Sequence, residues 1–116
     1  MKKTLLLLSQ GFESSSRTTQ EFKAFCRTFK SEFTKELKTI GATDIKFSNG
    51  HFDITGFFTS TSGQIYYFSL SDVRGSEYSN EIKMMYSTAQ HHIDWTGGSN
   101  QWVTLKTGVA VDMRIN

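Results

Sequence analysis

The residues best suited to metal binding are the adjacent histidines His91 and His92, with Asp94 two positions further on. Imidazole and carboxylate groups are common zinc ligands. Neighbouring residues of a strand point to opposite faces, however, so the two histidines can share a metal only where the chain turns between them. Neither a cysteine nor an H-x-x-x-H spacing accompanies them. The pattern therefore favours a solvated segment before Trp95 over a metal site.

Acid–base and nucleophilic catalysis have similarly weak support. His51 and Asp53 share one face of a predicted strand, where Ser48 and Lys46 are their expected cross-strand partners. Surface pairing explains the two residues better than a role as general acid and base. The three serines at 14–16 have no nucleophile-elbow context. We expect no catalytic residue.

Two further features have simple structural explanations. The segment Thr96–Asn100 (TGGSN) is rich in glycine, but it lacks the Lys-Ser/Thr of a P-loop and the spacing of a dinucleotide fingerprint. It predicts a turn between strands. Cys26 is the single cysteine and falls on an apolar helix stripe, where it is expected to be a small buried side chain in a reducing compartment. We therefore predict a non-enzymatic chain without cofactor or metal.

Charge is the best indication of a partner. One face of a predicted helix carries four basic side chains: Lys23, Arg27, Lys30 and Lys38. Residues 1–41 hold eight Lys or Arg against four Glu, giving +4, whereas residues 42–116 hold five against seven Asp or Glu, giving −2. Such asymmetry predicts a face that prefers an anionic partner. Thr34 interrupts the stripe and Glu32 and Glu36 lie nearby, so a plain solvated face is the alternative.

Aromatic residues offer a second candidate surface. In a sheet without a bulge, three of them would share the face opposite Phe52, Ile54 and Phe58: Phe57, Tyr66 and Phe68. Exposed sheet aromatics beside basic groups can stack on single-stranded bases at about 1–3 kcal/mol per base. The polar loop 71–80, which contains Arg74, and the loop 96–100 are further candidate contact surfaces for a protein partner. A sheet covered on both faces is the alternative explanation.

The strongest structural signal is an amphipathic helix over 18–40. Its apolar residues follow the i, i+3, i+4, i+7 spacing: Phe22, Phe25, Cys26, Phe29, Phe33, Leu37 and Ile40. Thr18 or Thr19 can cap its start, and Gly41 suits a left-handed residue after its end.

An antiparallel sheet is predicted to cover this stripe. Asn49-Gly50 is a strong two-residue hairpin signal, and it would pair Phe47 with Phe52, Ile45 with Ile54 and Lys46 with Asp53. Further strands are expected at 64–70, 81–89 and 101–105. Val109–Ile115 fits either a closing helix or a last strand.

At 116 residues the chain is expected to be a single α+β domain. It would comprise an N-terminal strand or arm at 1–16, one long N-terminal helix at 18–40, an antiparallel sheet of about four or five strands at 44–105 and a closing segment at 106–116. The run of four leucines near the start is too short for a signal peptide or a membrane span. We expect a cytoplasmic protein without a membrane partner.

Five segments carry a family resemblance: Phe29–Lys35 (FKSEFTK), Ile40–Ile45 (IGATDI), Asn49–Phe52 (NGHF), Tyr66–Arg74 (YYFSLSDVR) and Thr96–Asn100 (TGGSN). With them, most of residues 20–105 resembles small accessory proteins of bacterial mobile elements such as phages, plasmids and conjugative elements. The resemblance brings no catalytic residues. It implies a protein that acts on host machinery, with anti-CRISPR-like inhibitors among the possibilities.

These observations predict a non-enzymatic protein-interaction module that inhibits a host defence nuclease. The alternative is a nucleic-acid-binding protein that uses the basic helix face and the sheet aromatics. An uncovered aromatic sheet face would also favour a homodimer.

Overall fold

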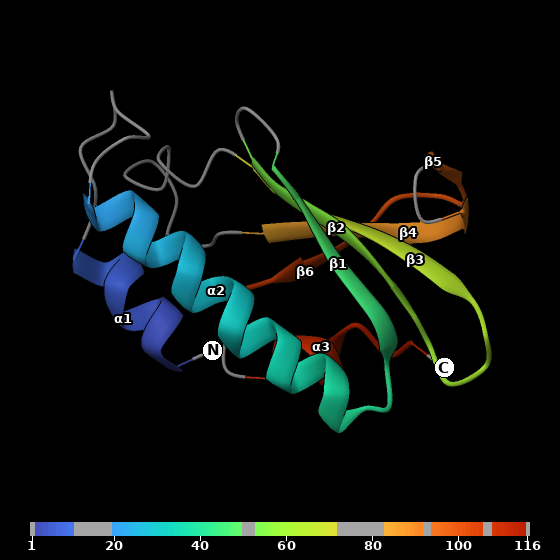
Figure 1. Cartoon of the computed structure of the whole chain (residues 1–116), viewed down its shortest axis with the longest axis horizontal. Helices are drawn as coiled ribbons and strands as arrows, with labels where there is room; N and C mark the ends of the chain where they lie inside the picture. Colours follow the sequence, from blue (N-terminus) through green and yellow to red (C-terminus); the bar gives the residue numbers. More distant parts are fainter. Residues whose placement is uncertain are drawn as a thin grey trace.

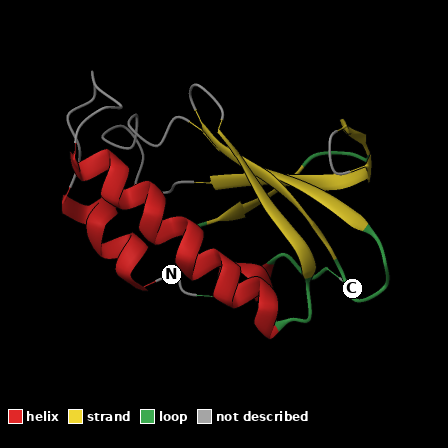
Figure 2. Ribbon diagram, in the orientation of Figure 1, coloured by secondary structure: helices red, strands yellow, loops and turns green. Residues whose placement is uncertain are grey.

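The structure, a computed structural model, describes residues 2–10, 20–49, 53–71, 83–91, 94–105 and 108–115. In chain order these form the elements α1 (Lys2–Gln10), α2 (Gln20–Thr39), β1 (Thr43–Asn49), β2 (Asp53–Thr59), β3 (Ile65–Ser71), β4 (Lys83–His91), β5 (Asp94–Gly97), β6 (Gln101–Thr104) and α3 (Val109–Asp112). The fold is α+β, as expected. Figure 1 shows the described helices together on one side of a twisted sheet, and Figure 2 separates the two kinds of element by colour.

The N-terminus departs from the prediction of a strand or arm, because residues 2–10 form helix α1. Consequently α2 is not the N-terminal helix. Leucine favours helices strongly, and no glycine or proline interrupts the run. Leu5 and Leu7 pack against the core, whereas Leu6 is 59% exposed. A nine-residue helix is marginal alone, so α1 depends on its contact with α2.

The predicted long helix is confirmed as α2. Four side chains of its apolar stripe are fully buried: Phe25, Phe29, Phe33 and Leu37. Ring centroids of Phe29 and Phe33 lie 5.4 Å apart, and Phe33 meets Phe68 of β3 edge-on at 5.0 Å. A ladder of rings thus runs along the helix and ends on the sheet, which fixes where α2 packs.

The C-terminus of α2 is closed by a Schellman motif. Gly41 has a φ of +87°, and its N–H donates to the Lys38 carbonyl at 3.0 Å. The N–H of Ala42 donates to the Leu37 carbonyl at 2.9 Å. Glycine adopts this left-handed conformation without strain, which is why the helix ends here and the chain turns into β1.

The described sheet is antiparallel and has six strands, one more than the upper expectation, in the order β1-β2-β3-β4-β5 with β6 also paired to β4. Two short strands therefore pair with the same edge of β4. β6 pairs along Lys83–Tyr86, and β5 pairs along Ala89–His91. The predicted turn at Thr96–Asn100 is shorter than expected, because β5 continues to Gly97.

The register of the first hairpin also departs from the prediction. Phe47 lies opposite Gly56 and Asn49 opposite Ile54, so the predicted pairs of Phe47 with Phe52 and Ile45 with Ile54 are wrong. The shift is four residues, an even number, so Phe47 and Ile54 still share the core face. Gly56 has no room for a side chain, because an added Cβ would overlap the Lys46 carbonyl oxygen and lie 2.6 Å from the Phe68 ring. Glycine here lets β1 and Phe68 approach closely.

The closing segment, which could have been helix or strand, forms α3 over Val109–Asp112. Val109, Ala110 and Met113 are buried in the core between α2 and the sheet strands. Among the described residues, no helix has the length and apolar character needed to cross a membrane.

Candidate functional site

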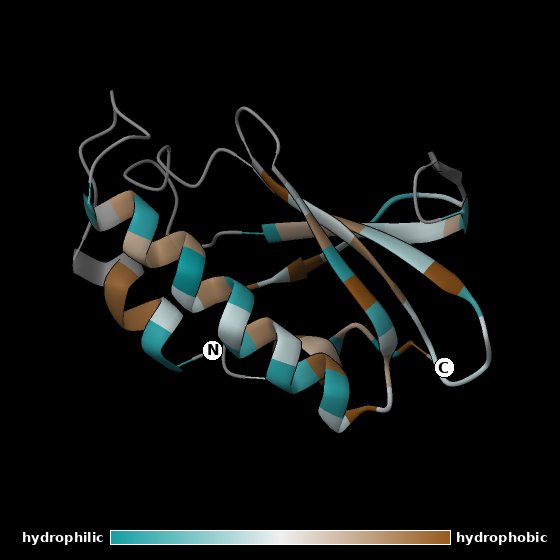
Figure 3. Cartoon of the chain, viewed as in Figure 1, coloured by the Kyte–Doolittle hydropathy of each residue, from teal (hydrophilic) through white to brown (hydrophobic). Residues whose placement is uncertain are grey.

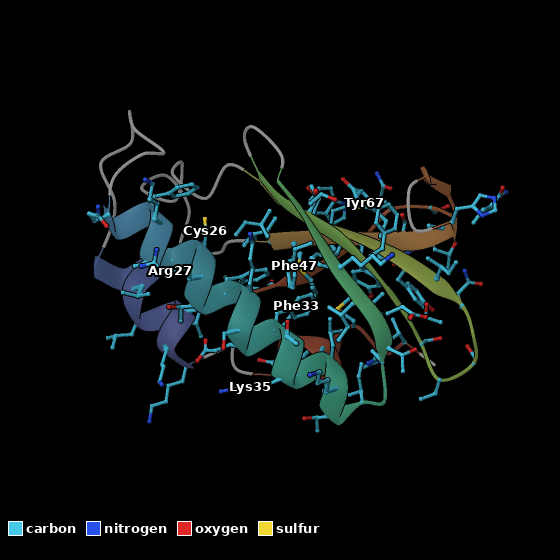
Figure 4. All side chains as sticks on the ribbon, in the orientation of Figure 1. Cys26, Arg27, Phe33, Lys35, Phe47 and Tyr67 are labelled. Atoms are coloured by element: carbon cyan, nitrogen blue, oxygen red, sulfur yellow. The ribbon has the colours of Figure 1, made fainter. Side chains whose placement is uncertain are left out.

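The outward face of α2 is the best candidate for a binding site. Among the side chains of α2 that the structure describes, the exposed charged ones are all basic: Lys23, Arg27, Lys35 and Lys38. Ser31 is also exposed and lies one helical turn from both Arg27 and Lys35. Figure 4 labels Arg27 and Lys35 on the helix, and Figure 3 shows hydrophilic residues recurring along it. We call these five residues the basic face.

Three of the four predicted stripe residues belong to the basic face, and the fourth, Lys30, differs. Lys30 is half-buried, and its Nζ lies 5.8 Å from the centroid of the Phe47 ring on β1. A cation over an aromatic ring is attracted by the electrons of that ring. Lys30 therefore links α2 to β1 at the edge of the sheet. Lys35, which the predicted stripe omitted, is exposed and belongs to the basic face.

The carboxylate of Glu32 caps α1. The backbone N–H groups of Lys3 and Thr4 donate to Glu32 oxygens at 2.9 and 2.8 Å, and the Thr4 hydroxyl donates at 2.5 Å. Partial burial alone would raise the pKa of Glu32, but the hydrogen bonds from Thr4 and Lys3 outweigh it and hold that pKa below its usual value. The charge is thus directed at the positive end of the α1 dipole.

Glu36 caps the N-terminus of α3 in the same way. Its Oε1 accepts a hydrogen bond from the Ala110 N–H at 3.0 Å, within the first turn of that helix. Each α2 glutamate with a described side chain therefore caps the N-terminus of a neighbouring helix. The sequence placed both glutamates close to the basic stripe, and the structure shows that their carboxylates accept hydrogen bonds from backbone N–H groups of α1 and α3.

A shallow groove adjoins the basic face where α1 meets α2. It encloses about 420 Å³ and is lined by Lys3, Arg27, Thr28, Ser31, Glu32, Lys35 and Glu36. Three cations thus surround a hollow whose two carboxylates already accept hydrogen bonds from helix N-termini. The five charged side chains of the lining, three basic and two acidic, sum to +1, so the charge of the groove favours an anionic group only slightly.

The predicted aromatic face is wrong for two of its three residues. Phe68 lies opposite Gly56 and Tyr66 opposite Phe58, so both point to the helix side of the sheet. Phe68 is fully buried, and Tyr66 packs against the core. The prediction failed because it assigned Phe58 and Tyr66 to opposite faces, whereas they are direct cross-strand partners.

Phe57 does occupy the outer face, with Tyr67 as its cross-strand partner at a ring distance of 5.2 Å. However, Phe57 is only 8% exposed. The sequence analysis missed Trp102, which lies opposite Met85 on this outer face and is 60% exposed. Only the register of β4 with β6 reveals its face, because the four residues of β6 are too few to show a clear period.

Apart from Cys26, the other residues considered as catalytic, metal-binding or partner-binding candidates either lie away from the basic face or fall outside the described part of the chain. Arg74, His51, His92 and the serines 14–16 fall among the residues that the structure does not describe. His91 is exposed and pairs in register with Asp94. Within the described ranges, no three His, Cys, Asp or Glu residues come close enough to hold a metal ion.

Cys26 is half-buried beside the basic face. Burial raises the pKa of its thiol, although the nearby charges of Lys30 and Arg27 act in the opposite direction. Since the thiolate is the reactive form, this environment suppresses nucleophilic chemistry.

No protein-family model matches the chain, and searches of curated proteins and of solved structures also returned no match.

Proposed function

We propose that this chain is a non-enzymatic interaction module of a phage or other mobile element, and that the basic face of α2 binds an acidic surface of a host protein. The observation that carries the proposal is the placement of charge on α2. Its basic side chains point outward, whereas Glu32 and Glu36 serve the neighbouring helices. Complementary charge accelerates association and selects the partner.

A host defence nuclease is the partner class that we favour. The sequence resemblance to mobile-element accessory proteins motivates this choice, as it does for anti-CRISPR-like inhibitors. Metal-dependent nucleases hold their ions with carboxylates, so their active sites offer acidic groups to a basic ligand. Lys3, Arg27 and Lys35 around the groove could each pair with such a group.

Nucleic-acid binding is the second candidate, since the same cations could contact phosphates. Its specific support is the exposed Trp102, because Lys83 lies diagonally beside it on the outer face of the sheet. The loss of Tyr66 and Phe68 from the exposed surface weakens the stacking platform that this candidate first required.

A photo-crosslinking experiment separates the two candidates. A photoreactive amino acid replaces Ser31, the centre of the basic face, and the full chain is irradiated in a bacterial extract. We expect a protein adduct that survives nuclease treatment and disappears when Arg27→Glu and Lys35→Glu are added. Lys83→Glu, a charge reversal on the sheet, is the matched control and should leave the adduct intact.

Four outcomes would contradict the proposal in whole or in part. An adduct destroyed by nuclease treatment would favour nucleic acid, and no adduct would remove the basic face as a binding site. The same adduct from a photoreactive group at the exposed Thr61 would show capture without specificity. An adduct with a protein that lacks nuclease activity would retain the interaction face but overturn the inhibitor assignment.

A further inference from the structure

A polar hollow of about 360 Å³ lies at the β3–β4 end of the sheet, on the side that faces the helices. Its lining comes from three parts of the chain: Tyr66, Tyr86, Ser87 and Thr88 of β3 and β4, Ser99 and Gln101 around the start of β6, and Met113 and Arg114 after α3. Cross-strand pairing places Tyr66 opposite Thr88 and Tyr86 opposite Gln101. The segment after α3 therefore lies beside the start of β3, since Met113 and Arg114 share the lining with Tyr66.

One wall of the hollow is the segment after α3, and it is held in place by specific bonds. The Tyr86 hydroxyl donates to the Met113 carbonyl at 2.9 Å, and the Arg114 N–H donates to the Val111 carbonyl at 3.1 Å. Arg114 has a φ of +53°. A residue with a side chain rarely adopts this left-handed conformation, and such strain concentrates at ligand sites.

The opposite wall is the glycine-rich turn that precedes β6. The Gly98 N–H donates to both the carbonyl and the hydroxyl of Thr88, at 3.1 and 3.0 Å. A Cβ at Gly98 would overlap the Thr88 hydroxyl, so glycine is needed for this approach. The turn is thereby fixed against β4, and Ser99 follows it into the lining of the hollow. This role goes beyond the simple connection that the TGGSN pattern predicted.

The chemistry of the lining is rich in donors. Among the described residues, no hydrogen-bond partner is found for the side chains of Tyr66, Ser99, Gln101 or Arg114, and no carboxylate lines the hollow. Burial raises the pKa of the Tyr86 hydroxyl, the neighbouring Tyr66 raises it further, and the Arg114 guanidinium acts in the opposite direction. Arg114 thus places its charge close to Tyr86, so positive charge and hydroxyl groups converge on one space.

We propose that this hollow binds a small phosphorylated molecule of sugar-phosphate or mononucleotide size. A guanidinium can donate two parallel hydrogen bonds to phosphate, and the remaining phosphate oxygens would accept from Ser99 and Tyr66. Gln101 and Thr88 would meet the hydroxyl groups of the ligand. The volume of the hollow falls near the lower end of the range for small-molecule sites, about 300–1,000 Å³. The proposal is independent of the basic face on α2.

The test is a titration of the full chain with ribose 5-phosphate, followed by NMR at the Ser99, Gln101 and Arg114 amides. Separate arms use inorganic phosphate, ribose and acetate. We expect ribose 5-phosphate to bind more tightly than each of them. Arg114→Met should weaken it at least about tenfold, because a hydrogen-bonded charge is lost. Arg27→Met, which removes an arginine from the basic face, is the matched control and should leave binding unchanged.

Tyr66→Phe is a second variant that keeps the ring in the core and removes the hydroxyl alone. It should weaken binding by about threefold to tenfold, and it covers the case in which Arg114→Met does not fold. Saturation by no probe up to about 10 mM would overturn the proposal, since such binding would be weaker than about 3 kcal/mol. Equal binding by the variants and the parent chain would also overturn it, as would tighter binding of acetate than of the phosphates.

Discussion

The carboxylate of Glu32 should decide whether α1 stays docked on α2. It accepts three hydrogen bonds from Lys3 and Thr4. A hydrogen bond to a charged group contributes about 1.5–3 kcal/mol, and Glu32→Gln loses at least one bond and the charge assistance of the others. Lys2 and Lys3 also lie at the positive end of the α1 dipole, where only an anion compensates them. We therefore expect Glu32→Gln to weaken the docking of α1 by about 2 kcal/mol, or about 30-fold in its opening equilibrium.

Native-state hydrogen exchange of the Leu6 and Leu7 amides measures this opening. In Glu32→Gln these amides should exchange about 30-fold faster, while amides of β2 and β3 keep their rates. Glu36→Gln is the matched control, because it should accelerate exchange at Ala110 of α3 and leave α1 unchanged. An acceleration below about threefold in α1, or an equal rise throughout the sheet, would refute the reasoning.

The pKa of Glu32 gives the same prediction a pH dependence. Because that pKa is lowered in the folded chain, the stabilisation of α1 is fully present above the ordinary glutamate pKa, about 4.3. It is lost as the pH falls through the lower pKa of the folded state. Exchange at Leu6 should therefore accelerate in acid in the parent chain, beyond its intrinsic pH dependence. In Glu32→Gln this additional acceleration should be absent, and its persistence would assign the acid response to another group.

Three further predictions concern the core and the thiol. Phe33→Ala should lower the free energy of unfolding by about 3–5 kcal/mol in urea titrations, because the ring is fully buried against Phe68; a loss under about 1 kcal/mol would contradict this packing. Gly56→Ala should lower the melting temperature by about 10 °C or more, since its Cβ would overlap the Lys46 carbonyl; an unchanged melting temperature would place β1 farther away. Cys26 should react with iodoacetamide more slowly than a cysteine introduced by Ser31→Cys in a Cys26→Ser background, and equal rates would contradict its protected environment.

The sequence was sufficient to predict the long helix and the face that it buries. Phe25, Phe29 and Phe33 repeat at helical spacing, and Gly41 has the conformational freedom that a left-handed residue needs. Apolar and aromatic segments separated by turn residues also predicted most strands of the sheet. These features depend on local periodicity and on backbone preferences, which a single sequence expresses directly.

Features that depend on pairing between distant segments could not be predicted in this way. Tyr66 of β3 lies directly opposite Phe58 of β2 and therefore shares its face, a pairing that the local pattern of neither strand specifies. The apolar run of α1 is too short to show a clear period, and its cap comes from Glu32, 28 residues from Thr4. The candidate site shared this limit, because the groove beside the basic face combines Lys3 of α1 with residues of α2 that are distant from it in the sequence.

On α2 the glutamates cap neighbouring helices and the exposed cations form the basic face, and this separation affects how the protein can change through evolution. Side chains that hold the helices together, Glu32 and Glu36, lie on one flank, and Lys23, Arg27 and Lys35 lie on another. Substitutions among the exposed cations alter little of the packed interior, so their effect on stability should be small. The chain can therefore acquire a different charge pattern, and with it a different partner, in single steps that each preserve the fold.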